Sequence, residues 1–376
     1  MSDSDRSIAV PARRVRRRWP EIALIGRYPP PYGGVTVHLQ RLSEYLESRG
    51  EDFVLYSLRG GQRPPNVIAP ARSRLGAALW MLRFCLRHRC RIVHLHTVNW
   101  TVRLLFGLAA RRRIGRYVLS VQGRSISEKL AKPRSARGGL TRWFLRRMDA
   151  VIACNARIER ECLEIVGLPR EKVHMIPAFI PPSPQRSCPL PEDVSSYLDV
   201  HRPVLCGVGA IGVTYRGREV YGVDMMVELI RRLRADFPQI GLVVPLIGGQ
   251  REAVGAFIDE SRRRVGEAAL LIPEALPDIS VILRASDLFL RPTNTDGDAV
   301  SIREALWEGT PVVASDAVPR PEPCVLFATR DDDDFETKVR AALADLPALK
   351  RRARSSTMPN NADRIMQVYS QLRSKS

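Results

Sequence analysis

The 376-residue sequence has few of the features that direct a chain to an oxidising compartment or into a membrane. Its seven cysteines form no Cys-x-x-Cys pair and show no metal-ligand spacing with the six histidines, which favours reduced, buried thiols in a cytosolic protein. The N-terminus has no apolar stretch of the kind that a signal peptide needs. The longest uncharged runs are about a dozen residues, short of the ~20 that span a bilayer. We therefore expect a cytoplasmic protein, either soluble or peripheral to a membrane.

Positive charge is plentiful, but it is confined to one half of the chain. The formal net charge is +19. Residues 1–180 hold 34 Lys and Arg against 13 Asp and Glu, a net of +21, whereas the remainder holds 25 against 27, a net of −2. An anionic partner should therefore approach the N-terminal half.

The basic residues of that half lie in four clusters, at 13–18, 71–91, 111–116 and 132–147. The second and fourth clusters mix arginine with Leu, Trp, Phe and Met at helical spacing, which is typical of a helix lying on a membrane surface. A solvated helix packed on a sheet is the alternative. Nucleic acid is a weaker candidate partner, since we find no aromatic stacking platform and no recognised binding motif. The tail 1–19 is expected to be disordered.

Short apolar segments alternate with helical segments in two series. The expected strands of the first series are 21–26, 52–57, 91–96, 117–122, 150–154 and 172–176, and those of the second are 203–209, 241–248, 269–272, 287–292, 311–315 and 324–327. Strands that are apolar throughout and separated by helices predict an α/β protein with parallel, doubly wound sheets. Such sheets bind ligands at the carboxyl ends of their strands.

A proline-rich stretch divides the two series. Residues 177–203 contain seven prolines, which remove backbone donors and favour an extended linker. We therefore expect a basic tail at 1–19, an N-terminal domain at 20–180, a linker at 181–202, a C-terminal domain at 203–350 and a C-terminal helix at 351–376.

Two glycines open the helix that follows the first strand. Gly33 and Gly34 have no Cβ, so their backbone amides can approach a bound group closely. The N-terminus of a helix carries about half a positive charge, which suits a diphosphate. The alternative is a tight strand-to-helix turn that binds nothing.

A second turn, at RPTNTDGDAVSIREALWEG, carries carboxylates. Gly297 lies at the turn, and the amides around Asp298, Ala299 and Val300 can hold a phosphate. The carboxylates of Asp296 and Glu304 would repel one, and they suit sugar hydroxyls because an ionised carboxylate only accepts hydrogen bonds. A ligand with a sugar, a diphosphate and a ribose would use both kinds of group. For Asp298 alone, capping of the helix is the preferred interpretation.

These residues resemble the acidic motif of the family 4 glycosyltransferases, with Asp296 and Glu304 separated by seven residues and followed by Ala305 and the GTPVVASD strand. The stretches PPPYGGVTVHLQRLSEYL, 149–181 and YGVDMMVELI also match the layout of that family, in order, over about residues 21–345. The resemblance implies a GT-B fold: two Rossmann-like domains facing each other across a cleft, with a C-terminal helix that crosses back. It also implies retaining transfer from a nucleoside diphosphate sugar, with no metal and no other cofactor.

By the same resemblance, Asp296 contacts the transferred sugar and Glu304 the ribose, while the diphosphate lies along Gly33, Gly34, Gly297, Asp298, Ala299 and Val300. The sequence departs from the family at several positions. Asp296 stands where Glu is usual and Ala299 where Gly is usual. Tyr221 and Ala210 replace a lysine and an arginine that bind phosphate, so Arg216 and Arg218 of the intervening segment are candidates to supply that charge.

The N-terminal domain departs from the family at its active-site histidine, which is Gln122 here. A glutamine can hydrogen-bond a sugar hydroxyl but cannot act as a base near neutral pH. His96 and Arg124 are candidates to bind the acceptor, and His94 lies two residues before His96. A buried histidine in the core is the alternative for both histidines.

Together these features predict a hexosyltransferase that uses a lipid-linked or anionic glycan acceptor at the inner face of the plasma membrane, as in cell-surface polysaccharide synthesis. The basic N-terminal half is the acceptor-binding half of this fold. The alternative is a degenerate, non-catalytic binding or scaffold protein. Gln122, Tyr221 and Ala210 favour that alternative, and the pair of Asp296 and Glu304 disfavours it.

Overall fold

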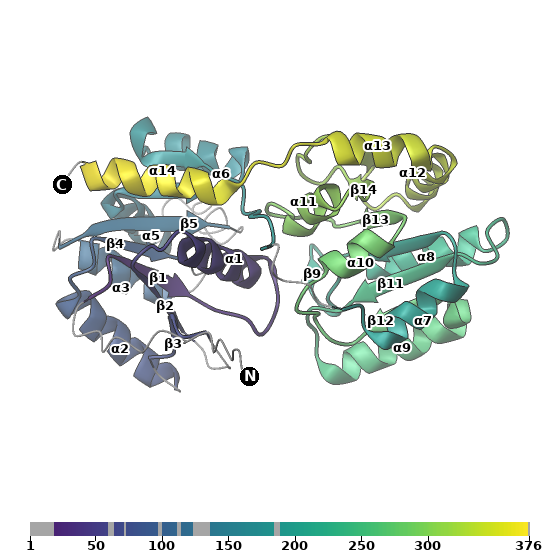
Figure 1. The fold of residues 1–376 in the computed structure, drawn as a ribbon, viewed down its shortest axis with the longest axis horizontal. Coiled ribbons are helices and arrows are strands. Elements are labelled where there is room, and N and C mark those ends of the chain that lie inside the picture. The colour runs from purple at the N-terminus through teal and green to yellow at the C-terminus, as the bar shows by residue number, and fades with distance from the viewer. Residues whose placement is uncertain are drawn as a thin grey trace, which may run out of the picture.

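The computed structural model describes residues 19–58, 64–70, 73–96, 100–110, 114–122, 136–183 and 189–374. They form two α/β domains that lie side by side (Figure 1). The predicted disordered tail, up to residue 18, and Arg124 lie outside the described residues.

The N-terminal domain contains a seven-stranded parallel sheet in the order β3-β2-β1-β4-β5-β6-β7. Its strands are β1 (Ile22–Gly26), β2 (Phe53–Ser57), β3 (Val67–Ile68), β4 (Ile92–Leu95), β5 (Arg116–Val121), β6 (Ala150–Ala153) and β7 (Val173–Met175). Its helices are α1 (Gly34–Ser48), α2 (Arg74–Arg87), α3 (Trp100–Ala110), α5 (Ala136–Arg147) and α6 (Ala156–Arg160), which continues as a π-helical turn over Glu161–Ile165. Helices α2, α3 and α5 pack on one face of the sheet and α1 on the other.

The C-terminal domain contains a six-stranded parallel sheet in the order β12-β11-β8-β13-β14-β15. Its strands are β8 (Val204–Gly207), β11 (Gly241–Pro245), β12 (Ala269–Ile272), β13 (Leu288–Arg291), β14 (Val312–Ser315) and β15 (Val325–Phe327), and a small hairpin pairs β9 (Thr214–Tyr215) with β10 (Arg218–Glu219). Its helices are α7 (Glu192–Val200), α8 (Val223–Leu233), α9 (Arg251–Val265), α10 (Ser280–Ala285), α11 (Val300–Trp307), α12 (Asp332–Ala344) and α13 (Leu346–Ser355).

The two sheets share one topology. In each, the second and third strands of the domain extend to one side of the first strand, and the fourth, fifth and sixth extend to the other, where the N-terminal sheet adds a seventh, β7. This is the doubly wound arrangement, and its strand order reverses beside the first strand. The predicted pair of Rossmann-like domains is confirmed.

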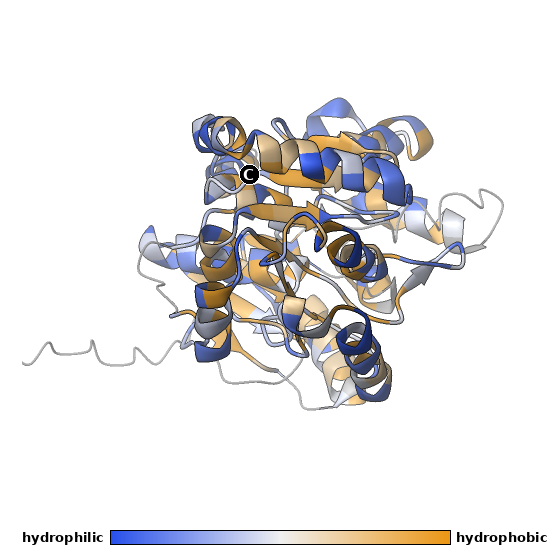
Figure 2. Cartoon of the chain, turned by 90° about the vertical axis from the view of Figure 1, so that its right-hand side faces the viewer, coloured by the Kyte–Doolittle hydropathy of each residue, from blue (hydrophilic) through white to orange (hydrophobic). Residues whose placement is uncertain are grey.

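Apolar periodicity explains why these segments fold as they do. The strands are buried on both faces, and α1 places Leu39, Leu42 and Leu46 against the sheet. Figure 2 shows apolar strands enclosed by helices whose outer faces are hydrophilic. Gly50, with a φ of 68°, follows the end of α1 in the left-handed conformation that favours glycine after a helix.

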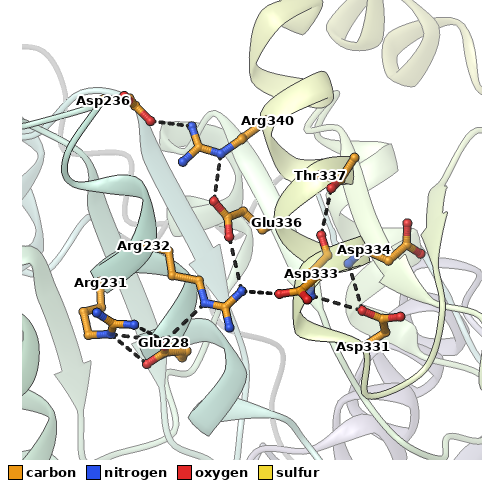
Figure 3. Close-up of polar contacts among 10 residues, drawn as sticks. All are labelled: Glu228, Arg231, Arg232, Asp236, Asp331, Asp333, Asp334, Glu336, Thr337 and Arg340. Atoms are coloured by element: carbon orange, nitrogen blue, oxygen red, sulfur yellow. Dashed lines mark hydrogen bonds and ion pairs between the residues drawn. The ribbon is translucent and has the colours of Figure 1, made fainter.

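Polar contacts between α8 and α12 reinforce the C-terminal domain at its surface (Figure 3). Arg232 on α8 donates to Asp333 at 2.7 Å and to Glu336 at 3.3 Å on α12, and to Glu228 on its own helix at 3.2 Å. Arg340 on α12 reaches back to Asp236 at 2.8 Å. Both helices bury their apolar faces in the same core, so these ion pairs lie at the edge of that contact.

A final helix, α14 (Asn361–Ser374), returns to the N-terminal domain (Figure 1). It buries Ile365, Val368 and Tyr369 against the same face of the sheet as α1. Asn361 at its start donates its Nδ2 to the Phe179 carbonyl at 2.7 Å. The predicted crossing of the C-terminal helix back to the first domain is confirmed.

Two predicted boundaries are displaced. The linker predicted at 181–202 contains α7, whose Val194 and Leu198 are buried in the C-terminal domain, because an amphipathic segment follows Pro191. The helix predicted over 351–376 is divided between α13, which buries Ala353 in the C-terminal domain, and α14. The chain therefore crosses between the domains at 356–360.

Among the described residues, no helix combines the length and the apolar composition that a membrane-spanning helix requires.

Candidate active site

A cavity of about 290 Å³ lies between the two domains. Its N-terminal wall is made by the first turn of α1, the end of β5 and Ala178, and its C-terminal wall by the ends of β8, β11 and β13 and the turn that leads into α11. These are the carboxyl ends of parallel strands, near the point in each sheet where the strand order reverses, which is where doubly wound sheets bind ligands. The volume is close to the lower end of the ~300–1,000 Å³ common for ligand pockets.

Two helix N-termini meet at this cavity. Gly33 precedes α1 in an extended conformation, and its N–H donates to the Thr36 hydroxyl at 3.0 Å, while that hydroxyl donates to the Pro31 carbonyl at 2.9 Å. A Cβ on Gly33 would meet nothing within 4 Å, and one on Gly34 would lie 3.7 Å from Val300 Cγ2 at the start of α11. Both turns therefore border one space, and binding of an anion at their amides stays a prediction.

Asp296 lies on the cavity wall and is held by two arginines. Arg291 Nε and Arg320 Nη1 each lie 3.1 Å from its Oδ2, and the Gly297 N–H donates to its Oδ1 at 3.0 Å. Burial alone would raise the pKa of this carboxyl, but the charges and hydrogen bonds of Arg291 and Arg320 outweigh burial and lower the pKa below its ordinary value. Asp296 is therefore an ionised, fixed hydrogen-bond acceptor.

Glu304 lies one helical turn into α11, and its carboxylate also faces the cavity. Its Oε1 lies 2.5 Å from Nη2 of Arg41 on α1, and both side chains are only 6% exposed. Arg41 Nη1 also donates to the Ile180 carbonyl at 3.0 Å, in the segment that leads out of the first domain. The two domains are thus joined by a buried ion pair at the cavity wall.

Asp298 also lines the cavity, but it does not cap α11 as predicted. The N-cap is Ala299, whose side chain offers no oxygen, and Asp298 instead accepts from the Ala178 N–H at 2.9 Å and pairs with Arg303 at 2.9 Å. Burial raises the pKa of Asp298 above its ordinary value, against the opposing effects of Arg303 and the Ala178 amide. The capping interpretation fails because the residue turns toward the linker segment.

Gln122 stands at the end of β5 on the cavity wall. Its Oε1 is buried and, within the described ranges, has no hydrogen-bond partner. The amide is therefore available to a ligand, in the position where the family resemblance predicts a sugar-contacting group.

His96 does not lie on the cavity wall, contrary to its assignment to the acceptor side. It is buried behind α1, with its ring centroid 3.9 Å from that of His94 and 5.3 Å from that of His38. Burial holds the pKa of His96 well below its ordinary value. The alternative of a core histidine is correct for His96 and for His94, which contacts the Tyr369 hydroxyl at 2.5 Å and that of Ser120 at 2.9 Å.

Arg216 and Arg218 do not reach the cavity either. They belong to the hairpin of β9 and β10, are exposed, and Arg216 lies over the Tyr215 ring at 5.3 Å. Arg216 and Gly217 both have positive φ, at 52° and 76°, which is the geometry of a two-residue hairpin turn. Both arginines are therefore exposed on a hairpin and lie off the cavity wall, so they do not supply charge to the cavity in this structure.

The arginines on the cavity wall are instead Arg41 and Arg291. Arg291 ends β13, and its guanidinium lies over the ring of Tyr221 at 5.3 Å, the residue that replaces the expected lysine. Sequence reasoning assigned Arg291 to a strand and did not single out Arg41. A charged residue ending an apolar strand, and a basic residue seven positions after Gly34 on the same helix face, were the available signals.

One part of the remaining wall is largely apolar, with Pro245, Ile247, Leu276, Pro277 and Ile279, and the carboxylate of Asp278 also lies there. In the part of the chain that the structure describes, no three His, Cys, Asp or Glu side chains are grouped to hold a metal ion. The cavity thus combines a surface for a planar apolar group, amides and arginines for an anion, and acceptors for hydroxyl groups.

Comparisons with known proteins agree with this geometry. Residues 32–183 match the family described as Glycosyltransferase Family 4, and residues 203–345 match Glycosyl transferases group 1. The chain is 28% identical over 253 residues to the lipopolysaccharide core biosynthesis mannosyltransferase LpcC of Rhizobium leguminosarum bv. viciae, covering 66% of this chain and 60% of that protein. It is 26% identical over 232 residues to the glycogen synthase of Mycobacterium tuberculosis H37Rv, covering 59% and 52%. The match therefore spans little more than half of each relative.

Solved structures share the whole architecture. WaaG, a glycosyltransferase involved in lipopolysaccharide biosynthesis, superposes with a TM-score of 0.68 at 16% identity, over 92% of this chain and 99% of that one. HepE of Anabaena, in complex with UDP-glucose, superposes with a TM-score of 0.67 at 14% identity, over 94% and 98%. At these identities the likeness establishes the fold, which is GT-B.

Proposed function

The chain belongs to the family 4 glycosyltransferases, and from that premise we propose that it is a retaining enzyme that uses a nucleoside diphosphate sugar. It transfers a hexose-type sugar to a lipid-linked or glycan acceptor in cell-surface polysaccharide synthesis, in the cytoplasm at the membrane face. The names of LpcC and WaaG, both tied to lipopolysaccharide, support the acceptor class. The UDP-glucose bound to HepE supports the donor class.

The observation that carries the proposal is that two helix N-termini and two carboxylates, whose side chains are 12% and 6% exposed, line one cavity. The base of the donor lies on the apolar wall at Ile247 and Ile279, and its ribose donates to Glu304. The diphosphate lies at the amides of Gly34 and Ala299. The sugar lies toward Asp296 and Gln122, at the opening of the first domain.

In the proposed reaction, the bond between the anomeric carbon and the phosphate oxygen breaks as the acceptor oxygen attacks on the same face of the sugar. The departing phosphate oxygen takes the proton of the acceptor hydroxyl, so no protein carboxylate serves as nucleophile or base. Arg291 has N–H groups beyond the one bound to Asp296, and these stabilise the developing charge of the diphosphate. The proposed step uses no metal.

The surface of α2 supports an acceptor in an anionic membrane. Leu75, Leu79, Leu82 and Leu86 follow one another at helical spacing and are 71%, 59%, 46% and 51% exposed. Met81, Phe84 and Cys85 on the same helix are buried against the sheet, so the exposed leucines form a separate stripe. The exposed Arg83 and Arg87 flank that stripe. An apolar stripe with flanking arginines suits insertion between anionic headgroups.

Vesicle binding tests the membrane assignment. We expect the protein to sediment with vesicles of anionic phospholipid, and the double variant Leu79→Ser/Leu82→Ser to lose most of that binding. The matched control is Val200→Ser, which removes an equally exposed apolar residue on α7 of the other domain. If the α2 variant binds vesicles as well as the wild type does, α2 is not the membrane-binding surface. If the protein prefers duplex DNA to vesicles, its anionic partner is nucleic acid instead.

Turnover tests the enzymatic assignment against the non-catalytic scaffold. The protein is incubated with UDP-, GDP- and ADP-linked hexoses and vesicles that carry a lipid extract, and the released sugar or product is followed by proton NMR. We expect one donor series to react and the first product formed to keep the donor's anomeric configuration. Inversion would reject the retaining mechanism. Nucleotide binding without turnover would favour the scaffold.

A further inference from the structure

We propose that Arg41 is a positioning residue that makes recognition of the donor ribose dependent on closure of the cleft, acting through Glu304. The inference rests on the proposed function, because it assumes that the cavity binds a nucleoside diphosphate. Its basis is the buried ion pair between Arg41 Nη2 and Glu304 Oε1, which lie 2.5 Å apart on helices of different domains.

The guanidinium of Arg41 is fixed from the side of the first domain. It belongs to α1, it donates to the Ile180 carbonyl at 3.0 Å, and it lies 6.0 Å from the centroid of the Phe179 ring. All three anchors move with the N-terminal domain and the segment that leaves it. The contact with Glu304 is therefore the one that Arg41 makes to the C-terminal domain among the described residues, and it is formed when the cleft is closed.

Glu304 needs such a partner in order to act as a ribose acceptor. Its side chain is 6% exposed, and a buried charge is costly unless it is paired and hydrogen-bonded. Arg41 engages Oε1, and in the described part of the chain no residue donates to Oε2, which remains for a ribose hydroxyl.

Other contacts across the cleft do not have this property. The Ala178 N–H donates to Asp298, and Asn155 Nδ2 donates to the Gly297 carbonyl at 3.3 Å, but each involves a backbone group. The ion pair of Arg41 and Glu304 joins side chains alone, at the residue assigned to the ribose. Because binding linkage is reciprocal, a ribose that prefers the paired form of Glu304 also stabilises the closed cleft.

The test is a double-mutant cycle in which binding is measured for nucleotides with and without the 2′-hydroxyl of the ribose. UDP, GDP and ADP, their 2′-deoxy forms and inorganic pyrophosphate are titrated calorimetrically into the wild type, Arg41→Gln, Glu304→Gln and the double variant. We expect Arg41→Gln to weaken the bound ribonucleotide about 10-fold or more, to abolish the preference over its 2′-deoxy form, and to leave pyrophosphate binding unchanged. The double variant should bind no more weakly than the single variants, because both act through one contact.

Several outcomes would overturn the inference. If Arg41→Gln keeps the wild-type preference for ribose, or if the losses of the two single variants add in the double variant, Arg41 does not act through Glu304. A parallel loss of pyrophosphate binding would make Arg41 a phosphate ligand instead. If the wild type binds none of the three nucleotides, the proposed function itself fails, which is a distinct result.

Folding is checked separately. Arg41→Gln leaves a buried carboxylate without its cation, whereas the double variant removes both charges and should unfold at nearly the wild-type urea concentration. Arg284→Gln is the matched control, since it breaks the ion pair with Glu308 on the outer side of α11. It should change neither nucleotide affinity nor ribose preference.

Discussion

Arg291 Nε lies 3.1 Å from Asp296 Oδ2 at the carboxyl end of β13, and the two side chains are only 9% and 12% exposed. The end of the strand thus places an arginine on the cavity wall, and the turn that follows places there a carboxylate of opposite charge. Arg320 contacts the same oxygen at 3.1 Å from another segment. Two cations around one carboxylate leave a net positive charge beside the place assigned to the leaving diphosphate.

Removing Arg291 should therefore damage both stability and binding. Arg291→Met leaves Asp296 with Arg320 alone and should lower the free energy of unfolding by about 3 kcal/mol, measured by urea denaturation. Arg291→Lys keeps the charge but loses the planar contact with Tyr221, so its cost should be smaller. An Arg291→Met variant as stable as the wild type would show that this pair is not needed to hold Asp296.

The cluster of buried histidines predicts a loss of stability in mild acid. Burial lowers the pKa of His38 from 6.5 to about 4 and holds those of His94 and His96 well below 6.5. The unfolded chain then binds more protons than the folded one, so this contribution is complete above pH 6.5 and is lost as the pH falls toward 4. For His38 alone, the free energy of unfolding should fall by about 1.4 kcal/mol for each pH unit in this range.

Denaturation at a series of pH values between 8 and 5 measures this slope. In His96→Phe the ring is kept and one titrating group is removed, so the stability should fall less steeply with acid than in the wild type. The variant also removes two buried ring nitrogens that have no hydrogen-bond partner among the described residues. Equal slopes for the two proteins would mean that His96 does not titrate in this range.

The ion pairs between α8 and α12 should contribute modestly and depend on salt (Figure 3). Arg232 contacts three carboxylates and its side chain is 28% exposed, so Arg232→Met should cost about 1 kcal/mol at low ionic strength and less at 1 M salt. The control is Arg231→Met on the same helix, which removes an exposed arginine that contacts Glu228 and should change stability less (Figure 3). A cost for Arg232→Met that does not shrink with salt would point to packing rather than charge.

A single methyl group at the first helix start tests the assigned phosphate site. Gly33 has a φ of −173°, which any residue adopts, and its Cβ would project into open space, so Gly33→Ala should fold normally. If a diphosphate lies against these amides, the methyl group should weaken nucleotide binding roughly 10-fold. The matched control is Gly255→Ala in the exposed interior of α9, which should leave binding unchanged and add roughly 0.5–1 kcal/mol of stability. Unchanged binding in Gly33→Ala would place the phosphates elsewhere.

The sequence was sufficient for the parts of the fold that follow from local periodicity. Uniformly apolar strands and the interleaved helices predict both sheets, and the spacing of Asp296 and Glu304 places them on one cavity with Gly33, Gly34 and Gln122. The strand β3 was not predicted because a strand of two residues is too short to show an apolar pattern. The helix α7 was missed because the density of prolines before it dominated the interpretation of that stretch.

The cations of the site could not be found from local patterns. Arg41 lies on the cavity wall because the fold brings α1 close to α11, where Arg41 pairs with Glu304, a residue far from it in the chain. Arg291 looks like the end of a strand until the topology places that end beside Tyr221. Arg216 and Arg218 were chosen for their proximity in sequence to the replaced lysine, but they are exposed on the β9–β10 hairpin and do not line the cavity.

The most direct test of the account is calorimetric titration of UDP, GDP and ADP into the wild type, Glu304→Gln and the control Glu308→Gln. Glu308 lies four residues further on, just past the end of the same helix, and pairs with Arg284 rather than with the cavity. We predict that one nucleotide binds the wild type and the control equally and binds Glu304→Gln at least 10-fold more weakly. Equal binding to all three proteins, or no binding to any, would contradict a donor site built on Glu304.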